Sequence, residues 1–345
     1  MWFMVNTTNP TTTNSKASAV SNASSADVTI RLDNVTRVFG STKAVDRLSF
    51  SVHRGEVFGF IGPNGAGKTT SMRILSTLEM PTEGHAWVDG FSVVDDPDHV
   101  RKRLGWMPDG FGTYSFVNCE EYLDFFARSY GLKANDRRNA LKRVMSFTQL
   151  DGMANKPIKG LSKGMKQRLC LGRTLIHDPS VLILDEPAAG LDPRARIELR
   201  EMITALAADG KTLLVSSHIL TELAEMVDRV GIIEQGQLLA VGTVDEILNR
   251  PSVDNNGDAE QTKSRIQLQL LDPDPRVETF LQQNEWVSEI RVIGREIKFQ
   301  FAGVQHQQAE LLKTLIDNEC RIVEFASQRK SLEDAFLSVT KGRVQ

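Results

Sequence analysis

The stretch Gly62-Pro63-Asn64-Gly65-Ala66-Gly67-Lys68-Thr69 decides the fold of this chain. It fits the pattern G-x-x-x-x-G-K-[ST], in which glycines let the backbone wrap closely around phosphates. A continuous apolar run, residues 57–61, precedes it, and residues 71–79 read as a helix. Backbone N–H groups and the helix N-terminus would then form an anion cradle. We expect Lys68 to neutralise the β- and γ-phosphates, the Thr69 hydroxyl to coordinate Mg²⁺, and the whole loop with Thr70 to bind the nucleotide.

A second apolar run, residues 181–184, ends in two carboxylates, Asp185 and Glu186. Burying charged side chains costs free energy unless a partner or a bound ligand balances them. After a phosphate loop, Asp185 is expected to hold Mg²⁺ directly or through water, and Glu186 to orient or deprotonate the attacking water. A third apolar strand lies at 212–215, with a helix near 194–208 between the two strands. Strands that alternate with helices predict an α/β sheet with parallel strands.

The remaining segments predict the division into domains. Residues 1–26 are rich in Thr, Ser and Asn and are interpreted as a disordered tail, and residues 251–264 are interpreted as a polar linker. The linker separates a domain over 27–250 from a small α+β domain over 265–345. There, strands from 266, at 287–293, at 296–301 and at 321–326 alternate with helices near 275–284 and 305–318. That βαββαβ order is the ferredoxin-like arrangement.

Composition excludes several classes of function. The 41 basic and 44 acidic residues give a net charge of −3, which is not the footprint of a nucleic-acid binder. The three cysteines are far apart, which argues against a disulfide scaffold or a cysteine zinc site. No apolar run approaches the roughly 20 residues that span a bilayer. We therefore expect a soluble, cytoplasmic chain.

Four further motifs resemble those of the ABC-type ATPases, and they occur in that family's order. The segment Leu161-Ser162-Lys163-Gly164-Met165-Lys166-Gln167-Arg168 resembles the signature motif, and Gly190-Leu191-Asp192-Pro193 resembles the D-loop. His218, after the strand that ends Val215-Ser216-Ser217, resembles the switch histidine. Phe39 resembles the aromatic residue that stacks on adenine. The resemblance covers residues 27–245.

The resemblance implies a P-loop ATPase core with an antiparallel edge and a helical subdomain at about 109–178. It also implies a head-to-tail homodimer that sandwiches ATP, with ATP and Mg²⁺ as cofactors. Ser162 and the Gly164 backbone would contact the γ-phosphate across the interface, Asp192 would link the two sites, and His218 would sense or hold the γ-phosphate. Glu186, His218 and Asp109 are the implied catalytic residues.

An ABC ATPase without membrane spans usually serves a separate transmembrane permease. Contacts with the permease are expected from Tyr114, Phe116 and the helix at 118–131, whose Tyr122, Leu123, Phe125, Phe126 and Tyr130 form an apolar stripe; local packing of these residues is the alternative. The tail Ser331-Leu332-Glu333-Asp334-Ala335-Phe336-Leu337 resembles that of ABC-2-type exporter ATPases. The implied location is the inner face of the cell membrane, reached only through the permease. Residues 265–345 are expected to stabilise the dimer or to dock the permease.

Two other functions remain open at this stage. One is a soluble ABC ATPase that acts on ribosomes or nucleic acid, although such proteins usually carry two cassettes or a coiled-coil insertion. The balanced charge also argues against it. The other is a nucleotide-binding regulatory module with weak catalysis, suggested by departures from the family pattern. In the signature, Lys163 and Met165 replace a Gly and a Gln, and Asp109 stands where the family usually has a Gln.

The departure at Asp109 generates a prediction. A carboxylate can still ligate Mg²⁺, but it adds negative charge beside Glu186, and like charges raise a carboxylate's pKa. We expect slower turnover or a shifted pH optimum for the natural chain relative to Asp109→Gln. The measurement is steady-state ATP hydrolysis by both proteins across pH. Equal rates at every pH would contradict it.

Overall fold

The computed structural model describes residues 27–110, 112, 116–219, 223, 225–248 and 264–328. The expected tail (1–26), nearly all of the expected linker and the segment from Ser331 lie outside the described residues. The expected end of the linker is wrong by one residue. Strand β11 already begins at Ser264, because this residue pairs with Phe301 and its hydroxyl donates to the Phe301 carbonyl at 3.3 Å.

A six-stranded sheet in the order β10-β9-β3-β8-β7-β6 forms the centre of the larger domain. Five strands are parallel and the edge strand β10 is antiparallel, which confirms the predicted α/β sheet. Every residue of β3, β7 and β8 is buried, as their apolar composition requires. The strands are β3 (Val57–Ile61), β6 (Leu104–Met107), β7 (Val181–Leu184), β8 (Thr212–Ser217), β9 (Arg229–Glu234) and β10 (Gln237–Thr243).

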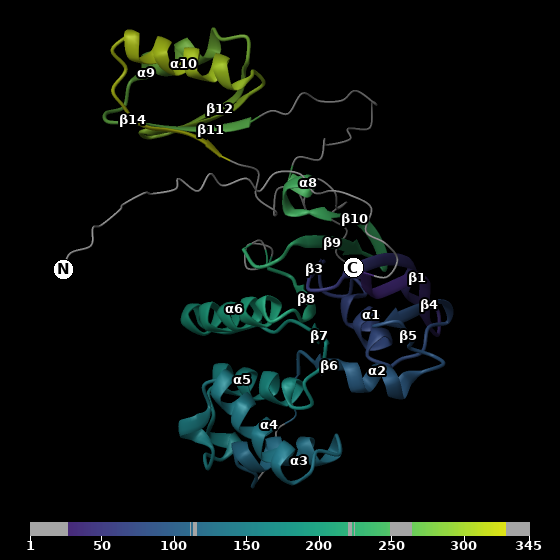
Figure 1. Ribbon diagram of the computed structural model, residues 1–345. Helices are drawn as coiled ribbons and strands as arrows, with labels where there is room; N and C mark the ends of the chain where they lie inside the picture. Colours follow the sequence, from purple (N-terminus) through teal and green to yellow (C-terminus); the bar gives the residue numbers. More distant parts are fainter. Residues whose placement is uncertain are drawn as a thin grey trace, which may run out of the picture.

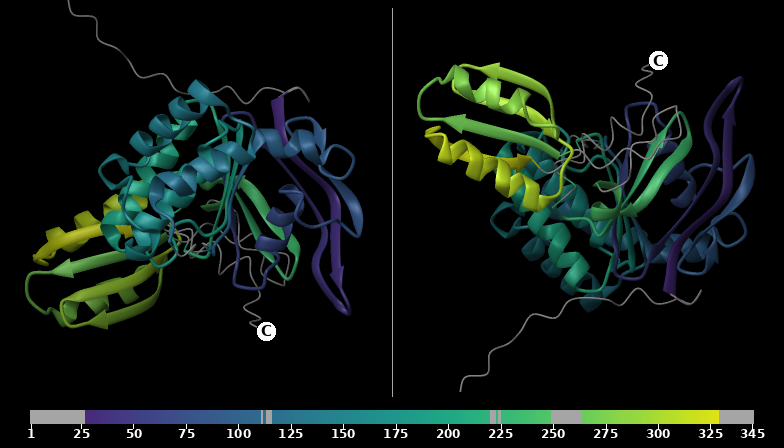
Figure 2. Two further views of the ribbon diagram at one scale, coloured as in Figure 1. Left: turned by 90° about the horizontal axis from the view of Figure 1, so that it is seen from below. Right: turned by 90° about the horizontal axis from the view of Figure 1, so that it is seen from above.

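An antiparallel sheet in the order β2-β1-β4-β5 provides the expected antiparallel edge. It packs beside the central sheet (Figure 2), and the rings of Phe50 and Phe58 stack between the two with centroids 5.1 Å apart. Helix α1 contributes Met72, Ile74 and Leu75 to the same core. The elements are β1 (Val28–Phe39), β2 (Thr42–His53), α1 (Lys68–Leu75), β4 (Glu83–Val88), β5 (Phe91–Ser92) and α2 (Pro97–Arg103).

The insertion between β6 and β7 is helical, as predicted. Helices α3 (Cys119–Ser129), α4 (Ala134–Phe147) and α5 (Lys163–Leu175) gather at the β6 end of the central sheet (Figure 1). Asn118 and Glu121 form a capping box that fixes the start of α3. Short 3₁₀ turns, Asp151–Met153 and Ile158–Gly160, join α4 to α5. Helix α6 (Pro193–Ala208) connects β7 to β8, and α8 (Val244–Leu248) follows β10.

The C-terminal domain has the predicted ferredoxin-like topology. Its sheet is antiparallel in the order β12-β13-β11-β14, with both helices on one face (Figure 1). The alternate residues Ile266, Leu268 and Leu270 point into a separate apolar core. The elements are β11 (Ser264–Leu270), α9 (Pro275–Gln282), β12 (Val287–Ile293), β13 (Glu296–Phe301), α10 (Gln305–Asp317) and β14 (Ile322–Gln328).

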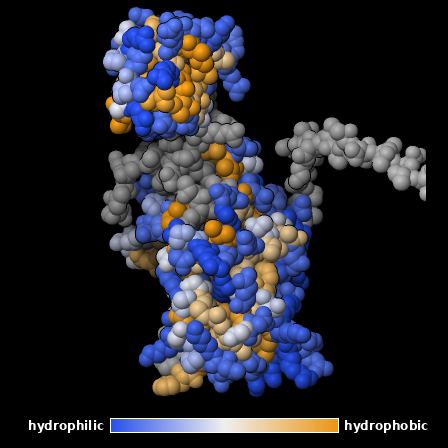
Figure 3. Space-filling view, turned by 90° about the vertical axis from the view of Figure 1, so that its left-hand side faces the viewer, coloured by the Kyte–Doolittle hydropathy of each residue, from blue (hydrophilic) through white to orange (hydrophobic). Residues whose placement is uncertain are grey.

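The surface of the molecule is mainly hydrophilic in the view of Figure 3, with apolar side chains gathered on the C-terminal domain. The exposed large apolar residues of that domain are Leu271, Val292, Ile293, Val304, Ile316 and Val323. Across the described ranges, the helices all fall short of the length and apolar character that crossing a bilayer requires.

Candidate functional site

The phosphate loop leads from β3 into α1, and two of its glycines, Gly62 and Gly67, are required by close backbone contacts. A Cβ at Gly67 would lie 2.5 Å from the carbonyl oxygen of Ala44, and one at Gly62 would overlap the carbonyl oxygen of Ile233. Gly67 caps α1 with a φ of 102°, so no side chain covers the first N–H groups of the helix. The loop therefore presents uncovered backbone donors at a helix N-terminus, which is a site for an anion.

Lys68 fixes a positive charge inside this loop. Its side chain is buried, and its Nζ donates to the carbonyls of Gly62 at 2.6 Å and Pro63 at 3.2 Å. The same Nζ lies 3.4 Å from Oε1 of Glu186. The loop thus brings together the predicted phosphate ligand and the predicted catalytic carboxylate.

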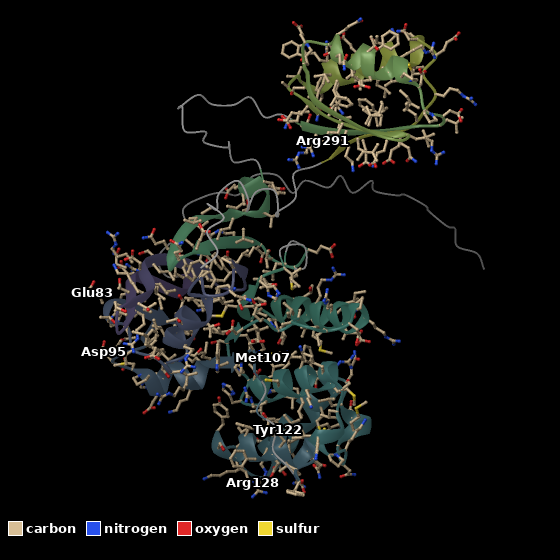
Figure 4. The ribbon with its side chains drawn as sticks, turned by 180° about the vertical axis from the view of Figure 1, so that it is seen from behind. Glu83, Asp95, Met107, Tyr122, Arg128 and Arg291 are labelled. Atoms are coloured by element: carbon tan, nitrogen blue, oxygen red, sulfur yellow. The ribbon has the colours of Figure 1, made fainter. Side chains whose placement is uncertain are left out.

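The two carboxylates after β7 are held by one buried hydroxyl, that of Ser216 on β8. Ser216 Oγ donates to Oδ1 of Asp185 at 2.7 Å and accepts the backbone N–H of Glu186 at 2.8 Å. Asp185 also donates its N–H to the carbonyl of Met107, the last residue of β6, at 2.8 Å. Figure 4 labels Met107 where the central sheet meets the helices.

The role of Ser216 is absent from the sequence prediction, in which this residue only ends a strand. A signal was nonetheless present. In the parallel pair β7 and β8, Leu184 lies beside Val215. The next residues, Asp185 and Ser216, therefore meet at the same edge of the sheet.

Asp185 has the properties of a cation ligand. Burial raises the pKa of its carboxyl, the hydrogen bond from Ser216 and the nearby Thr69 hydroxyl lower it, and the charges of Glu186 and Asp109 raise it. Its Oδ2 is buried without a hydrogen-bond partner, which is costly unless a further ligand satisfies it. A carboxylate beside a threonine hydroxyl is the hard oxygen set that Mg²⁺ takes. The residues present therefore fit the ion.

The part of the chain that the structure describes contains no group of three or more His, Cys, Asp or Glu side chains able to hold a metal. Such a cluster is not needed, because Mg²⁺ in phosphate sites is held by one or two protein oxygens, substrate phosphates and water. Asp109 is exposed beyond the end of β6, and its charge acts on Asp185. Its roles as metal ligand and catalytic residue stay predictions.

Glu186 lies between two nitrogen-bearing groups. Its Oε1 faces Lys68, and its Oε2 is 2.6 Å from Nδ1 of His218, which follows β8. The His218 side chain is 43% exposed, whereas that of Glu186 is only 11% exposed. Glu186 also has a φ of 49°, an uncommon conformation for a residue with a side chain, of the kind that clusters at functional sites.

The signature and D-loop residues form a second, separate group. Ser162 caps α5 by accepting the Met165 N–H at 3.3 Å, and Asp192 caps α6 by accepting the Ala195 N–H at 3.0 Å. The two helix starts touch, because a Cβ at Gly164 would lie 3.2 Å from that of Ala195. Within the described ranges, no hydrogen bond or ion pair joins Ser162, Lys163 or Gly164 to the phosphate loop.

Phe39 ends β1 and is 44% exposed. The guanidinium of Arg37 lies 4.4 Å from the centroid of its ring, held by an ion pair with Glu79 at 2.6 Å. One face of the ring is therefore covered by a cation, and stacking on adenine through the other face stays a prediction.

A cavity of about 340 Å³ opens between the sheet domain and the helices. Apolar side chains form most of its wall, and two arginines, Arg101 and Arg173, also line it; the apolar lining residues are Leu78, Leu104, Trp106, Phe126 and Tyr130. The predicted stripe on α3 is thus split. Tyr122 and Leu123 are buried, whereas Phe125 is 58% and Tyr130 42% exposed. Phe116 is fully exposed, and Tyr114 lies outside the described residues.

Comparisons with known proteins agree with this geometry. The sequence model of the ABC transporter family matches residues 45–189. The bacitracin transport ATP-binding protein BcrA of Bacillus licheniformis is 32% identical over 314 residues, which are 91% of this chain and 97% of BcrA. The probable multidrug ABC transporter ATP-binding protein YbhF of Escherichia coli is 36% identical over 70% of this chain, but that match spans only 42% of YbhF.

A solved ATP-binding subunit of an ABC transporter is similar in structure, with a TM-score of 0.59 and 29% identity. The similarity covers 64% of this chain and 91% of the solved one.

The bridging hydroxyl generates a prediction. Ser216→Ala should lower the free energy of unfolding by about 1–3 kcal/mol, because a buried carboxylate and a buried N–H lose their partner. The loss should be larger at neutral than at acid pH, since the Ser216 hydroxyl stabilises the charged form of Asp185, which exists only above that carboxyl's raised pKa. Denaturant unfolding at several pH values checks this. Ser217→Ala is the matched control, and equal losses for both variants would contradict the role of Ser216.

Proposed function

The chain belongs to the ABC transporter family of ATP-hydrolysing subunits, and on that premise we propose that it energises a separate membrane permease, as an exporter ATPase, through an ATP-sandwich dimer. The observation that carries the proposal is the position of Glu186, held between Lys68 of the phosphate loop and His218. The functions in the relatives' names, bacitracin transport and multidrug transport, support a transport role. The tail that resembles ABC-2-type exporters supports the direction of transport.

The geometry supports hydrolysis by water activated at Glu186. The loop N–H groups and Lys68 bind the β- and γ-phosphates, which places the γ-phosphorus near the Glu186 carboxylate. Glu186 orients a water and accepts its proton as the new P–O bond forms, and the bond to ADP breaks in line. His218 holds the Glu186 carboxylate in place and offers its second nitrogen to the γ-phosphate. Asp185 and Thr69 would hold Mg²⁺, which neutralises phosphate charge when bound.

The separation of the site into two groups supports a dimer. Ser162 and Gly164 lie at the start of α5, beside the D-loop, and in the described part of the chain no hydrogen bond or ion pair joins them to the phosphate loop. A second copy in head-to-tail orientation would supply them to the γ-phosphate, and Asp192 would connect the two sites. Because this chain carries every motif, we propose a homodimer.

The apolar cavity beside α3 supports docking of the permease. It combines exposed Leu78 and Tyr130 with Trp106 and Phe126, and it lies between the nucleotide-binding sheet and the helices that carry the signature. A permease segment bound there would touch both parts whose relative position ATP controls. The chain would then sit at the inner membrane face through its partner. The C-terminal domain, with its exposed apolar residues, is proposed to strengthen the dimer or to dock the permease.

Glu186→Gln tests the sandwich mechanism. The amide keeps the shape of the side chain but cannot accept a proton, so we expect Mg-ATP hydrolysis to fall about 100-fold or more. The variant should form a dimer that ATP holds together, measured by light scattering with and without ATP. A chain that ends at residue 248 tests the C-terminal domain in the same assay. If neither the natural chain nor the variant hydrolyses ATP or dimerises, the catalytic interpretation is wrong.

Leu78→Arg tests the docking cavity. Replacing this apolar contact by a third arginine, in a cavity already lined by Arg101 and Arg173, should weaken permease binding about tenfold, as expected for loss of an apolar contact in the centre of an interface. Basal ATP hydrolysis should be unchanged, because Leu78 follows α1 on the side away from the loop. The readout is stimulation of hydrolysis by the reconstituted permease. Val241→Arg, on the exposed edge strand β10, is the control, and equal stimulation of both variants would contradict docking at the cavity.

A further inference from the structure

We propose that Lys163 carries an additional positive charge to the γ-phosphate bound by the opposite subunit, and that Gly190 of the D-loop positions its side chain for this task. The inference rests on the proposed ATP-sandwich dimer. It concerns a residue at which this chain departs from the usual signature, so the resemblance to the family does not assign it a role.

The first observation is the path of the Lys163 side chain. Lys163 is the first residue of α5, directly between Ser162 and Gly164. Its side chain extends along the D-loop and lies over Gly190, where a Cβ would be 3.3 Å from Cε of Lys163 and would overlap its ammonium nitrogen. Gly190 has a φ of 66°. The D-loop thus has a glycine, Gly190, at the position that the Lys163 side chain covers.

The second observation is that this charge has no partner within the described part of the chain. No ion pair or hydrogen bond of the Lys163 side chain is found there. Asp192 of the D-loop accepts the Ala195 N–H as the cap of α6, and Glu198 of α6 pairs with both Arg168 and Arg194. The first turn of α5 also contains no acidic residue. Lys163 is exposed, so water solvates its charge, but the helix dipole weakly disfavours a cation at this end of α5 and favours an anion there. An anion that docks at the start of α5 would therefore be attracted by both the helix dipole and the lysine.

The anion that Lys163 would meet in the proposed dimer is the γ-phosphate. In the proposed dimer the start of α5 faces the γ-phosphate of the other subunit, and Lys163 stands between the two residues that contact it. An ammonium group binds phosphate as a mobile point charge, so it needs no fixed geometry. The γ-phosphate is present in ATP and missing from ADP. Lys163 would therefore strengthen the dimer with ATP and not with ADP.

A lysine that only packs against the D-loop would give a different result. Its removal would change the thermal stability of the monomer, and the ATP concentration needed for dimerisation would stay the same. A charge that acts across the interface would change that concentration and its dependence on salt, because charge interactions are screened.

The experiment uses the full chain carrying Glu186→Gln, so that ATP is bound and not hydrolysed. Dimer formation is followed by light scattering during titration with Mg-ATP. Three proteins are compared: the chain that keeps Lys163, Lys163→Gln and Lys163→Arg. Lys166→Gln, the same charge change one turn further along α5, is the matched control. We expect Lys163→Gln to raise the ATP concentration at half-dimerisation about tenfold, as for loss of one charged contact, and to weaken its salt dependence. For Lys163→Arg and Lys166→Gln, the ATP concentration at half-dimerisation should stay within about twofold of the value for the chain that keeps Lys163.

A double-mutant cycle tests the role of Gly190. Gly190→Ala displaces the lysine side chain, so it should raise the ATP concentration at half-dimerisation when Lys163 is present. In the Lys163→Gln background the same substitution should raise it less. Nucleotide binding to the monomer, measured with a fluorescent ATP analogue, should be the same for all variants, because it uses the phosphate loop. Equal half-dimerisation concentrations for Lys163 and Lys163→Gln would overturn the inference and leave the proposed function intact. Absence of any ATP-dependent dimer with Lys163 present would overturn the proposed function, and this inference with it.

Discussion

The buried hydrogen bond from Ser216 to Asp185 is the interaction on which the rest of the site depends. It places a carboxylate at the end of β7 with one oxygen hydrogen-bonded and the other buried without a partner. The same hydroxyl fixes the Glu186 backbone, and from there Glu186 reaches both Lys68 and His218. Three parallel strands thus contribute to one charged edge, and their apolar cores make its geometry rigid.

Much of the fold follows from local sequence patterns. The phosphate loop, the apolar strands at 57–61 and 181–184 and the βαββαβ order are visible without a structure, because each depends on neighbouring residues. The role of Ser216, the split of the α3 stripe and the position of Lys163 over Gly190 are not visible in this way. They arise where segments far apart in the chain meet, and residue type alone does not say which face of a helix a partner covers.

The pairing of the signature with the D-loop has a mechanical meaning. Arg168 of α5 pairs with Glu198 of α6, and Gly164 packs against Ala195, so the start of α5 moves with the start of α6. Since α6 begins only seven residues after Glu186, a change at the proposed site of hydrolysis would be passed to the helical part through a short covalent path and one ion pair. The apolar cavity lies at the far end of that path.

If Phe39 stacks on the base, as predicted, its half-covered ring would limit how the chain can tell one nucleobase from another. Arg37 occupies one face of the ring, so only a single face is open to a base, and every base has a π-face that can stack there. Stacking on one exposed ring carries no pattern of donors and acceptors, so it cannot separate adenine from guanine as paired hydrogen bonds would. With stacking on Phe39 as the predicted contact to the base, the phosphate loop and Lys68 would select a nucleotide by its phosphates, and the choice of base would follow the nucleotide pool around the protein.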